Sequence, residues 1–306
     1  RLMNNPDVEY AAPARIHQLS FTPNDPRLGQ QSYLNKIKVP QAWDVTKGSS
    51  DILIAIIDTG VDWMHEDLAA NIWTNPGEIA GNNIDDDNNG YIDDVRGWDF
   101  VGNVSPAEAQ SGILRPDADP RQLGSSWTDG QAHGTVVAGN AAAVTNNAKG
   151  VSGIASNCKI LAIKVASDNP GQTGIIEGYT AIRYAADMGA DVINCSWGGY
   201  GADPAAQTFI DYAISKGAVV VAAAGNNGVN MNNNPHAPAS LDGVLSVGSV
   251  NGSDQPSWFS NYGYANTTYA PGENPLSTFP GNQYLSLIHI SEPTRLRRIS
   301  YAVFCL

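Results

Sequence analysis

Three polar side chains occupy positions in this sequence where chemistry could take place. Asp58 directly follows the apolar run 53–57 and precedes a Thr-Gly turn, while Asn226 follows the apolar run 219–224 and one glycine. His133 opens the stretch His133-Gly-Thr-Val-Val-Ala-Gly139, whose small residues predict a tightly packed helix. A carboxylate can orient an imidazole, an imidazole can act as a general base, and an amide can donate a hydrogen bond to a developing oxyanion.

Each of these residues also has a purely structural interpretation. Asp58 could cap its own turn, His133 could cap the helix that it begins, and Asn226 could be a turn former. A metal-dependent hydrolase with Asp58 and His133 as ligands is another hypothesis, and it is disfavoured because no third ligand lies at a fitting spacing. The elements around these residues help to decide between the alternatives.

Short apolar runs alternate with helical patterns through the middle of the chain. Continuous rather than alternating hydrophobicity is typical of strands buried on both faces of a parallel sheet. The sequence therefore predicts an α/β fold: a three-layer, doubly wound, mostly parallel sheet with helices on both faces. The predicted strands are Ile52 to Ile57, Ile160 to Val165, Asp191 to Cys195, Ala218 to Ala223 and Val244 to Val250.

Two further helices and two insertions are predicted between these strands. A stripe of apolar residues indicates a helix over Thr173 to Gly189, and Asp203-Pro204 predicts the start of another that ends at Gly217. The polar, Gly- and Asp-rich stretches 71–94 and 103–131 are expected to be ordered surface loops. In open parallel sheets chemistry occurs at the carboxyl ends of the strands, which is where Asp58 and Asn226 are expected.

Composition excludes several classes of protein. The chain has 306 residues, 42% of them hydrophobic, and a net charge of −13, which disfavours both nucleic acid and anionic membrane surfaces as partners. Three cysteines cannot form a disulfide framework, and no apolar run reaches the roughly 20 residues that cross a bilayer. We expect a monomer.

The order of the three residues resembles that of the subtilisin-like serine proteases, the subtilases of peptidase family S8. Asp, His and an oxyanion Asn stand there in the same order on separate strand-helix units. The resemblance covers residues 22–284 and includes the motifs Asp58-Thr-Gly-Val-Asp-Trp-Met-His65-Glu-Asp67-Leu, His133-Gly-Thr-Val-Val-Ala-Gly139, Asn194-Cys-Ser196-Trp-Gly-Gly199, Ala224-Gly-Asn226, Phe259-Ser-Asn-Tyr262-Gly and Ala270-Pro-Gly272.

The resemblance implies a role for each matching residue. Asp58 would orient His133, which would act as general base toward a serine, and Asn226 would stabilise the oxyanion. Ser196, Trp197 and Gly198 would offer a backbone edge to an extended polypeptide substrate, with Gly225 also binding substrate, although Trp197 could instead be core filler. The Ala237-Pro238 bond is expected to resemble the family's cis-proline turn.

The nucleophile that the family requires is missing from its expected place. Subtilases carry their serine in a Gly-Thr-Ser segment, and no serine after Asn226 has that context. Residues 285–306 resemble an in-frame translation of a sequencing adapter, and residues 5–11 resemble the end of a subtilase propeptide. We therefore expect a propeptide remnant at 1–14, an incomplete catalytic domain at 15–284 and a non-native tail at 285–306.

Two sets of residues are predicted to bind calcium as a structural ion. Residues 48–95 contain no Lys or Arg, and within them Asp85, Asp87, Asn89 and Asp93 follow the spacing of a calcium loop up to its ninth position. Arg96 stands where such a loop has its bidentate Glu, so a solvated acidic loop remains the alternative. Resemblance to thermitase-like subtilases implies a second set, Asp25, Asp67 and Asn147.

These observations lead to one main hypothesis and one rival. The main hypothesis is a secreted, calcium-stabilised serine endopeptidase, made as a zymogen with its own propeptide, of which the printed chain is an inactive fragment. The rival is a catalytically dead subtilase that acts as a peptide-binding module along Ser196 to Gly198.

Overall fold

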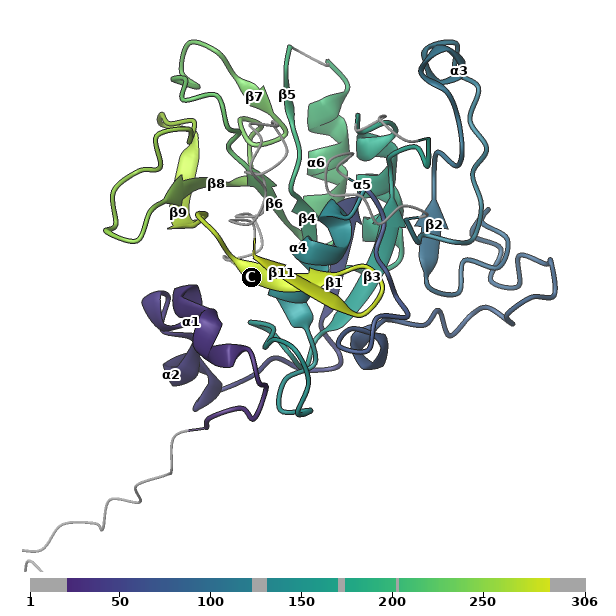
Figure 1. Ribbon diagram of the computed structural model, residues 1–306. Coiled ribbons are helices and arrows are strands. Elements are labelled where there is room, and N and C mark those ends of the chain that lie inside the picture. The colour runs from purple at the N-terminus through teal and green to yellow at the C-terminus, as the bar shows by residue number, and fades with distance from the viewer. Residues whose placement is uncertain (1–20, 123–130, 170–173, 202–203, 287–306) are drawn as a thin grey trace, which may run out of the picture.

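The computed structural model describes residues 21–122, 131–169, 174–201 and 204–286. The expected propeptide remnant and almost all of the expected tail lie outside these residues. Within them a seven-stranded parallel sheet forms the centre, with strand order β2-β3-β1-β4-β6-β8-β9 (Figure 1). Its strands are β1 (Leu53–Asp58), β2 (Gly97–Asp99), β3 (Lys159–Lys164), β4 (Val192–Cys195), β6 (Val219–Ala223), β8 (Leu245–Val250) and β9 (Asn266–Pro271).

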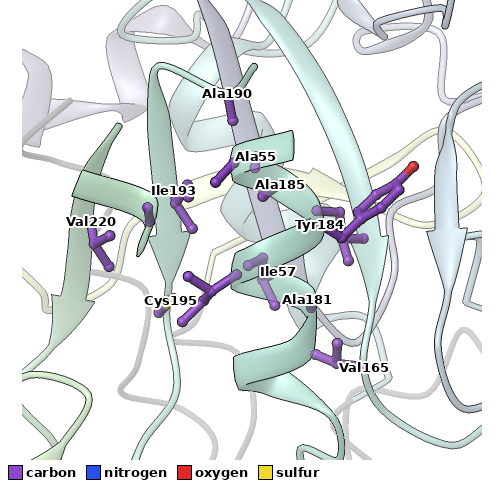
Figure 2. Close-up of a cluster of buried hydrophobic side chains, with 14 of the residues drawn as sticks. Ala55, Ile57, Val165, Ala181, Tyr184, Ala185, Ala190, Ile193, Cys195 and Val220 are labelled. Carbon is purple, nitrogen blue, oxygen red and sulfur yellow. The ribbon is translucent and has the colours of Figure 1, made fainter. Parts of the chain in front are cut away.

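Helices cover both faces of the sheet because the central strands are apolar on both sides. Successive residues of β1 alternate between two cores: Ala55 and Ile57 pack with helices α5 and α6, whereas Ile54 and Ile56 pack with α4. Figure 2 shows Ala181 of α5 near Ile57 in the first of these cores. The helices are α1 (Ser32–Lys36), α2 (Val39–Trp43), α3 (Pro106–Gln110), α4 (His133–Ala142), α5 (Gly178–Asp187) and α6 (Ala206–Ser215), with 3₁₀ turns η2 (Leu28–Gln30) and η3 (Ala69–Asn71).

A third core lies under the short helices α1 and α2. Tyr33 and Trp43 from these helices pack against Val221 of β6 and Val247 of β8. The three-layer α/β class predicted from the sequence is thereby confirmed, since all five predicted strands form and the helices lie on both faces.

The helix expected over Thr173 to Gly189 is shorter than predicted. Ile175 forms an antiparallel bridge with Ala166, and Glu177 has a left-handed backbone with φ of 60°, so the regular helix begins only at Gly178. Thr173 itself lies outside the described residues. The second helix begins at Ala206 and is followed by Gly217, whose φ is 94°.

Several elements have no clear signal in the sequence. The edge strands β2 and β9 are short or polar, and two small hairpins add β5 (Gly199–Tyr200) with β7 (His236–Ala237) and β10 (Leu276–Phe279) with β11 (Gln283–Ser286). The β10 strand docks on α4 through Thr278, whose Oγ1 donates to the Thr135 carbonyl at 2.8 Å. Cys158 and Cys195 are buried free thiols. None of the described helices is long and apolar enough to cross a membrane.

Candidate active site

The end of β1 and the start of α4 bring an aspartate and a histidine into contact. His133 Nδ1 lies 2.8 Å from Asp58 Oδ1 and 2.9 Å from Oδ2, and the two side chains are 5% and 2% exposed. Asp58 is held in turn by the backbone N–H of Thr59, which donates to Oδ1 at 2.7 Å. The carboxylate therefore fixes the orientation of the imidazole ring.

The turn after β1 also fixes the first residues of α4. Thr59 Oγ1 donates to the carbonyl of Gln131 at 2.9 Å and accepts the Gly134 N–H at 3.0 Å, so one hydroxyl joins the strand end to the helix start. Gly134 must be glycine, because a Cβ there would lie 2.3 Å from the Gly60 carbonyl oxygen. This close approach is what lets His133 reach Asp58.

The far nitrogen of the histidine ring has the character of a base. With its Nδ1–H directed at the Asp58 carboxylate, a neutral ring carries its lone pair on Nε2. Within the described part of the chain His133 Nε2 is buried and has no hydrogen-bond partner. Such an atom can accept a proton from a group that enters the site beside it.

Asp58 and His133 lie on the wall of a cleft of 620 Å³. The segment Ser196 to Gly198, between β4 and β5, lines the same cleft. The structure therefore brings this predicted segment to the same cleft as Asp58 and His133. Trp197 is 9% exposed; its indole N–H donates to the Ile57 carbonyl at 2.9 Å and its ring packs edge-on against Tyr179. Trp197 thus belongs to the core and also lines the cleft, and its role in binding substrate stays a prediction.

Asn226 lies on the turn after β6, half-buried, and outside the residues that line the cleft. Gly225 allows this turn with a φ of 102°. Asn261 holds the turn: its Nδ2 donates to the Ala224 carbonyl at 2.8 Å, and its Oδ1 accepts the N–H groups of Asn227 and Val229, both at 3.1 Å. From the sequence alone, Asn261 was recognisable only as part of a motif.

His236 is a second residue that the sequence analysis missed. It opens β7, one residue before the Ala237-Pro238 bond, which is cis as expected. Burial lowers the pKa of its imidazole, and its Nδ1 has no hydrogen-bond partner among the described residues. The sequence around His236 has no helical or strand periodicity, so nothing in it predicts that this side chain is buried.

The acidic loop gathers a different set of carboxylates from the one predicted. Glu78, Asp87 and Asp94 bring oxygens within 4.8 Å of one another, and oxygen ligands of this kind suit calcium. Asp94 is buried; burial raises its pKa, and Tyr184 Oη donates to it at 2.7 Å. Of these three residues only Asp87 was predicted, because Glu78 and Asp94 lie outside the loop spacing.

The other predicted ligands of that loop bind backbone N–H groups. Asp85 accepts from Asn89 and Gly90 at 3.0 and 2.8 Å, and Asp93 accepts from residues 81, 82 and 83. Asn89 donates its side-chain amide to Asp87 and Asp94 at 3.1 and 3.0 Å. These contacts shape the loop around the carboxylate cluster.

The second predicted calcium set is brought together in space. Asn147 Nδ2 donates to Asp67 Oδ1 at 2.7 Å, and the Asn147 N–H donates to Asp25 Oδ1 at 3.1 Å. Asp67 is fully buried and also accepts the Val151 N–H at 2.9 Å; burial raises its pKa. These contacts gather two buried carboxylates and one amide from three distant segments, and their role as calcium ligands stays a prediction.

Comparison with known proteins gives consistent similarities. Residues 49–298 match the family described as the subtilase family. The chain is 40% identical over 284 residues to a thermophilic serine proteinase of Bacillus sp. (strain AK1), covering 92% of this chain and 59% of that protein. It is 40% identical over 275 residues to thermitase of Thermoactinomyces vulgaris, covering 90% and 82%.

A solved structure resembles this one along most of its length. It is that of a protease from Pseudoalteromonas arctica PAMC 21717, with a TM-score of 0.70 and 30% identity, covering 92% of this chain and 84% of that chain. Other relatives are named as extracellular proteases. The chain spans 59% of the length of the thermophilic proteinase, so the activity of a whole protein has to be argued from the site.

Proposed function

The chain belongs to the subtilase family, and we propose that its gene product is a serine endopeptidase that hydrolyses peptide bonds with an Asp58-His133-Ser triad. The observation that carries this proposal is the buried Asp58–His133 pair at 2.8 Å, whose outer nitrogen faces no partner among the described residues. The relatives named as a serine proteinase and a serine protease support the same chemistry. The side chain that completes the triad is a serine hydroxyl beside His133 Nε2.

In the proposed reaction each residue has a distinct role. His133 Nε2 takes the hydroxyl proton as the serine oxygen bonds to the scissile carbonyl carbon, and Asp58 stabilises the imidazolium that forms. The Asn226 amide donates a hydrogen bond to the carbonyl oxygen as it becomes an oxyanion, an interaction worth about 3–4 kcal/mol. His133 then returns the proton to the leaving amine as the C–N bond breaks, which leaves an ester on the serine. A water molecule, deprotonated by His133, attacks this ester, and the serine oxygen leaves with the proton as the acid is released.

We propose that the printed chain itself lacks peptidase activity. No serine after Asn226 stands in a Gly-Thr-Ser context. Three of them are engaged elsewhere: Ser277 Oγ donates to the Val136 carbonyl at 2.7 Å, and Ser249 and Ser257 bond to each other at 2.7 Å. The same absence supports the alternative function, a catalytically dead subtilase that binds peptides along Ser196 to Gly198.

Labelling with a fluorophosphonate separates the two functions. The product of the complete gene is expected to bind the reagent covalently at one serine, and His133→Gln should abolish labelling because the base is lost. Asp44→Asn, a surface substitution outside the cleft, should leave labelling intact. A complete gene that encodes no Gly-Thr-Ser segment, or a product that is not labelled, would contradict the protease proposal and favour the binding module.

The remaining features of the main hypothesis are proposed with it. Calcium would be held as a structural ion in the acidic loop and by the set Asp25, Asp67 and Asn147. In the loop, Asp85, Asp87, Asn89 and Asp93 are the ligands predicted from the sequence, and Glu78 and Asp94 lie close to Asp87. The charge of the ion would neutralise carboxylates that otherwise repel one another. We propose secretion, a monomer, and synthesis with a propeptide of which residues 1–14 are the end, followed by the catalytic domain from residue 15. Relatives named as extracellular proteases support secretion.

A further inference from the structure

Lys164 is a buried cation at the carboxyl end of β3. Its side chain is 1% exposed, and its Nζ lies 2.6 Å from Asp99 Oδ2 and 3.2 Å from Asp168 Oδ1. Replacing a buried ion pair by apolar side chains is often neutral or stabilising, so stability alone gives no reason for a lysine at this position. Lys164 stands opposite Asp58 in the pairing of β3 with β1, at the edge of the sheet where chemistry occurs.

The stem of Lys164 packs against the turn that follows Asp58. Thr59 forms a bridge with Lys164, and a Cβ on Gly60 would lie 3.0 Å from Lys164 Cδ. The next residue of the same strand end, Val165, donates its N–H to the Asp58 carbonyl at 2.9 Å. The lysine therefore contacts the turn whose threonine hydroxyl joins the end of β1 to the start of α4.

A chain of contacts leads from the ammonium group of Lys164 to His133. The Asp168 carboxylate binds Lys164, and the Asp168 carbonyl accepts a hydrogen bond from Gln131 Nε2 at 3.0 Å. Gln131 is 6% exposed and lies two residues before His133. Its own carbonyl accepts the hydroxyl of Thr59 at 2.9 Å, so the chain of contacts ends on the turn where it began.

The second carboxylate ties the same ammonium group to the segment after β2. Asp99 Oδ1 accepts the N–H groups of Val101 and Gly102 at 2.9 and 3.0 Å. The Asp168 N–H donates to the Gly102 carbonyl at 3.3 Å. The segments after β2 and after β3 are therefore fixed to each other around Lys164, and Asp168 is held from both its side chain and its backbone.

These contacts bear on how the proposed base is held. Asp58 and His133 are 75 residues apart in the chain, so their contact depends on whatever fixes the turn and the start of the helix together. Resting on the proposed function, we infer that Lys164 is a positioning residue for His133. It acts through the turn after Asp58 on one side and through Asp168 and Gln131 on the other. A misplacement of about 1 Å can cost about 10²-fold in rate.

Two substitutions interrupt the chain of contacts without leaving a buried charge unpaired. Gln131→Met removes the amide that donates to Asp168, and Asp168→Asn removes one ion pair of Lys164 while Asp99 still binds it. Gln207→Met is the matched control, because Gln207 Nε2 also donates to a backbone carbonyl at 3.0 Å, but in an exposed hydrogen bond on α6.

Removing the lysine itself requires a combined variant. Lys164→Met is made together with Asp99→Asn and Asp168→Asn, so that no buried carboxylate is left without its cation. This triple variant should lose at least as much kcat as Asp168→Asn alone. A folded triple variant with the kcat of the wild type would contradict the inference.

The complete gene product shows whether the contacts act on the chemical step. Gln131→Met and Asp168→Asn should each lower kcat about tenfold or more and change KM less than about twofold, because the base and not the binding of substrate is disturbed. The double variant should lose no more than the larger single loss, since both substitutions cut one chain of contacts. Losses that multiply, or a lower melting temperature with unchanged kcat in variants that circular dichroism shows to be folded, would overturn the inference.

A measurement on the printed chain separates this inference from the proposed function. NMR can follow the Nδ1 proton that His133 shares with Asp58, and this requires no nucleophile. Its exchange with water should be about tenfold faster in both single variants, the effect of one lost hydrogen bond, and unchanged in the control. Faster exchange without hydrolysis by the complete product would contradict the protease proposal but support the role of Lys164. Hydrolysis by the complete product with unchanged exchange in both variants would overturn the role of Lys164 alone.

Discussion

The substitution Asn261→Ala tests whether one buried amide holds the turn that carries Asn226. Asn261 is fully buried and makes four hydrogen bonds from its side chain. Two of its partners, the Ala224 carbonyl and the Val229 N–H, are buried or half-buried and cannot be hydrated without opening the turn. The other two, on Asn227 and Tyr200, are exposed and can bind water instead.

The expected loss of stability follows from this division. A buried polar group that loses its partner costs about 1–3 kcal/mol, so two such groups with partial relaxation give about 4 kcal/mol. A loss of this size is larger than that of most single substitutions. In the complete gene product the displaced turn should also lower kcat, by at least about tenfold, because an oxyanion donor is worth 10²–10³ in rate.

Urea unfolding of the printed chain measures the first effect, with Asn251→Ala as the matched control. Asn251 Oδ1 also accepts two backbone N–H groups, from Ser253 at 2.8 Å and Gln255 at 3.1 Å, but these bonds are exposed. The control should lose less than about 1 kcal/mol. Equal losses for the two variants would refute the reasoning, because burial of the partners would then have no consequence.

Three more results are expected. Gly134→Ala should lower the free energy of unfolding by about 1–3 kcal/mol, since its Cβ would lie 2.3 Å from the Gly60 carbonyl oxygen. The control Gly29→Ala, whose Cβ would have nothing within 4 Å, should leave the melting temperature unchanged when both variants are measured by thermal unfolding. Burial lowers the pKa of His236 below 6.5, so on acidification the unfolded chain binds this proton at a higher pH than the folded chain does. The contribution of this group to the free energy of unfolding is therefore complete above pH 6.5 and falls as the pH is lowered. The difference in the free energy of unfolding between the wild type and His236→Asn should be smaller at about pH 5 than at about pH 8. Calcium should raise the melting temperature relative to a chelator, and Asp94→Asn should reduce that increase; an equal increase in the variant would exclude the acidic cluster as a source of it.

Much of the fold could be predicted because its signal is local. The strands β1, β3 and β6 are nearly continuous apolar runs, and burial on both faces is typical of a parallel sheet covered by helices. The edge strand β9 and the hairpins were missed because their residues are polar or too few to show a period. The start of α5 was misjudged because Ile175 pairs with Ala166 instead of joining the helix.

The sequence by itself determined the five inner strands of the sheet, their order along the chain and the strand-end positions of Asp58 and Asn226, because hydrophobic runs and turn residues act over short distances. The residue patterns left open which side chains share one site: a resemblance implied it for Asp58 and His133, and the tertiary structure decided it. The Asp58–His133 contact, the hold of Asn261 on its turn and the place of His236 between Gly198 and Gly225 join segments far apart in the chain. Contacts of this kind depend on which strands and turns lie side by side, and the pattern of hydrophobic and turn residues along the chain does not specify that.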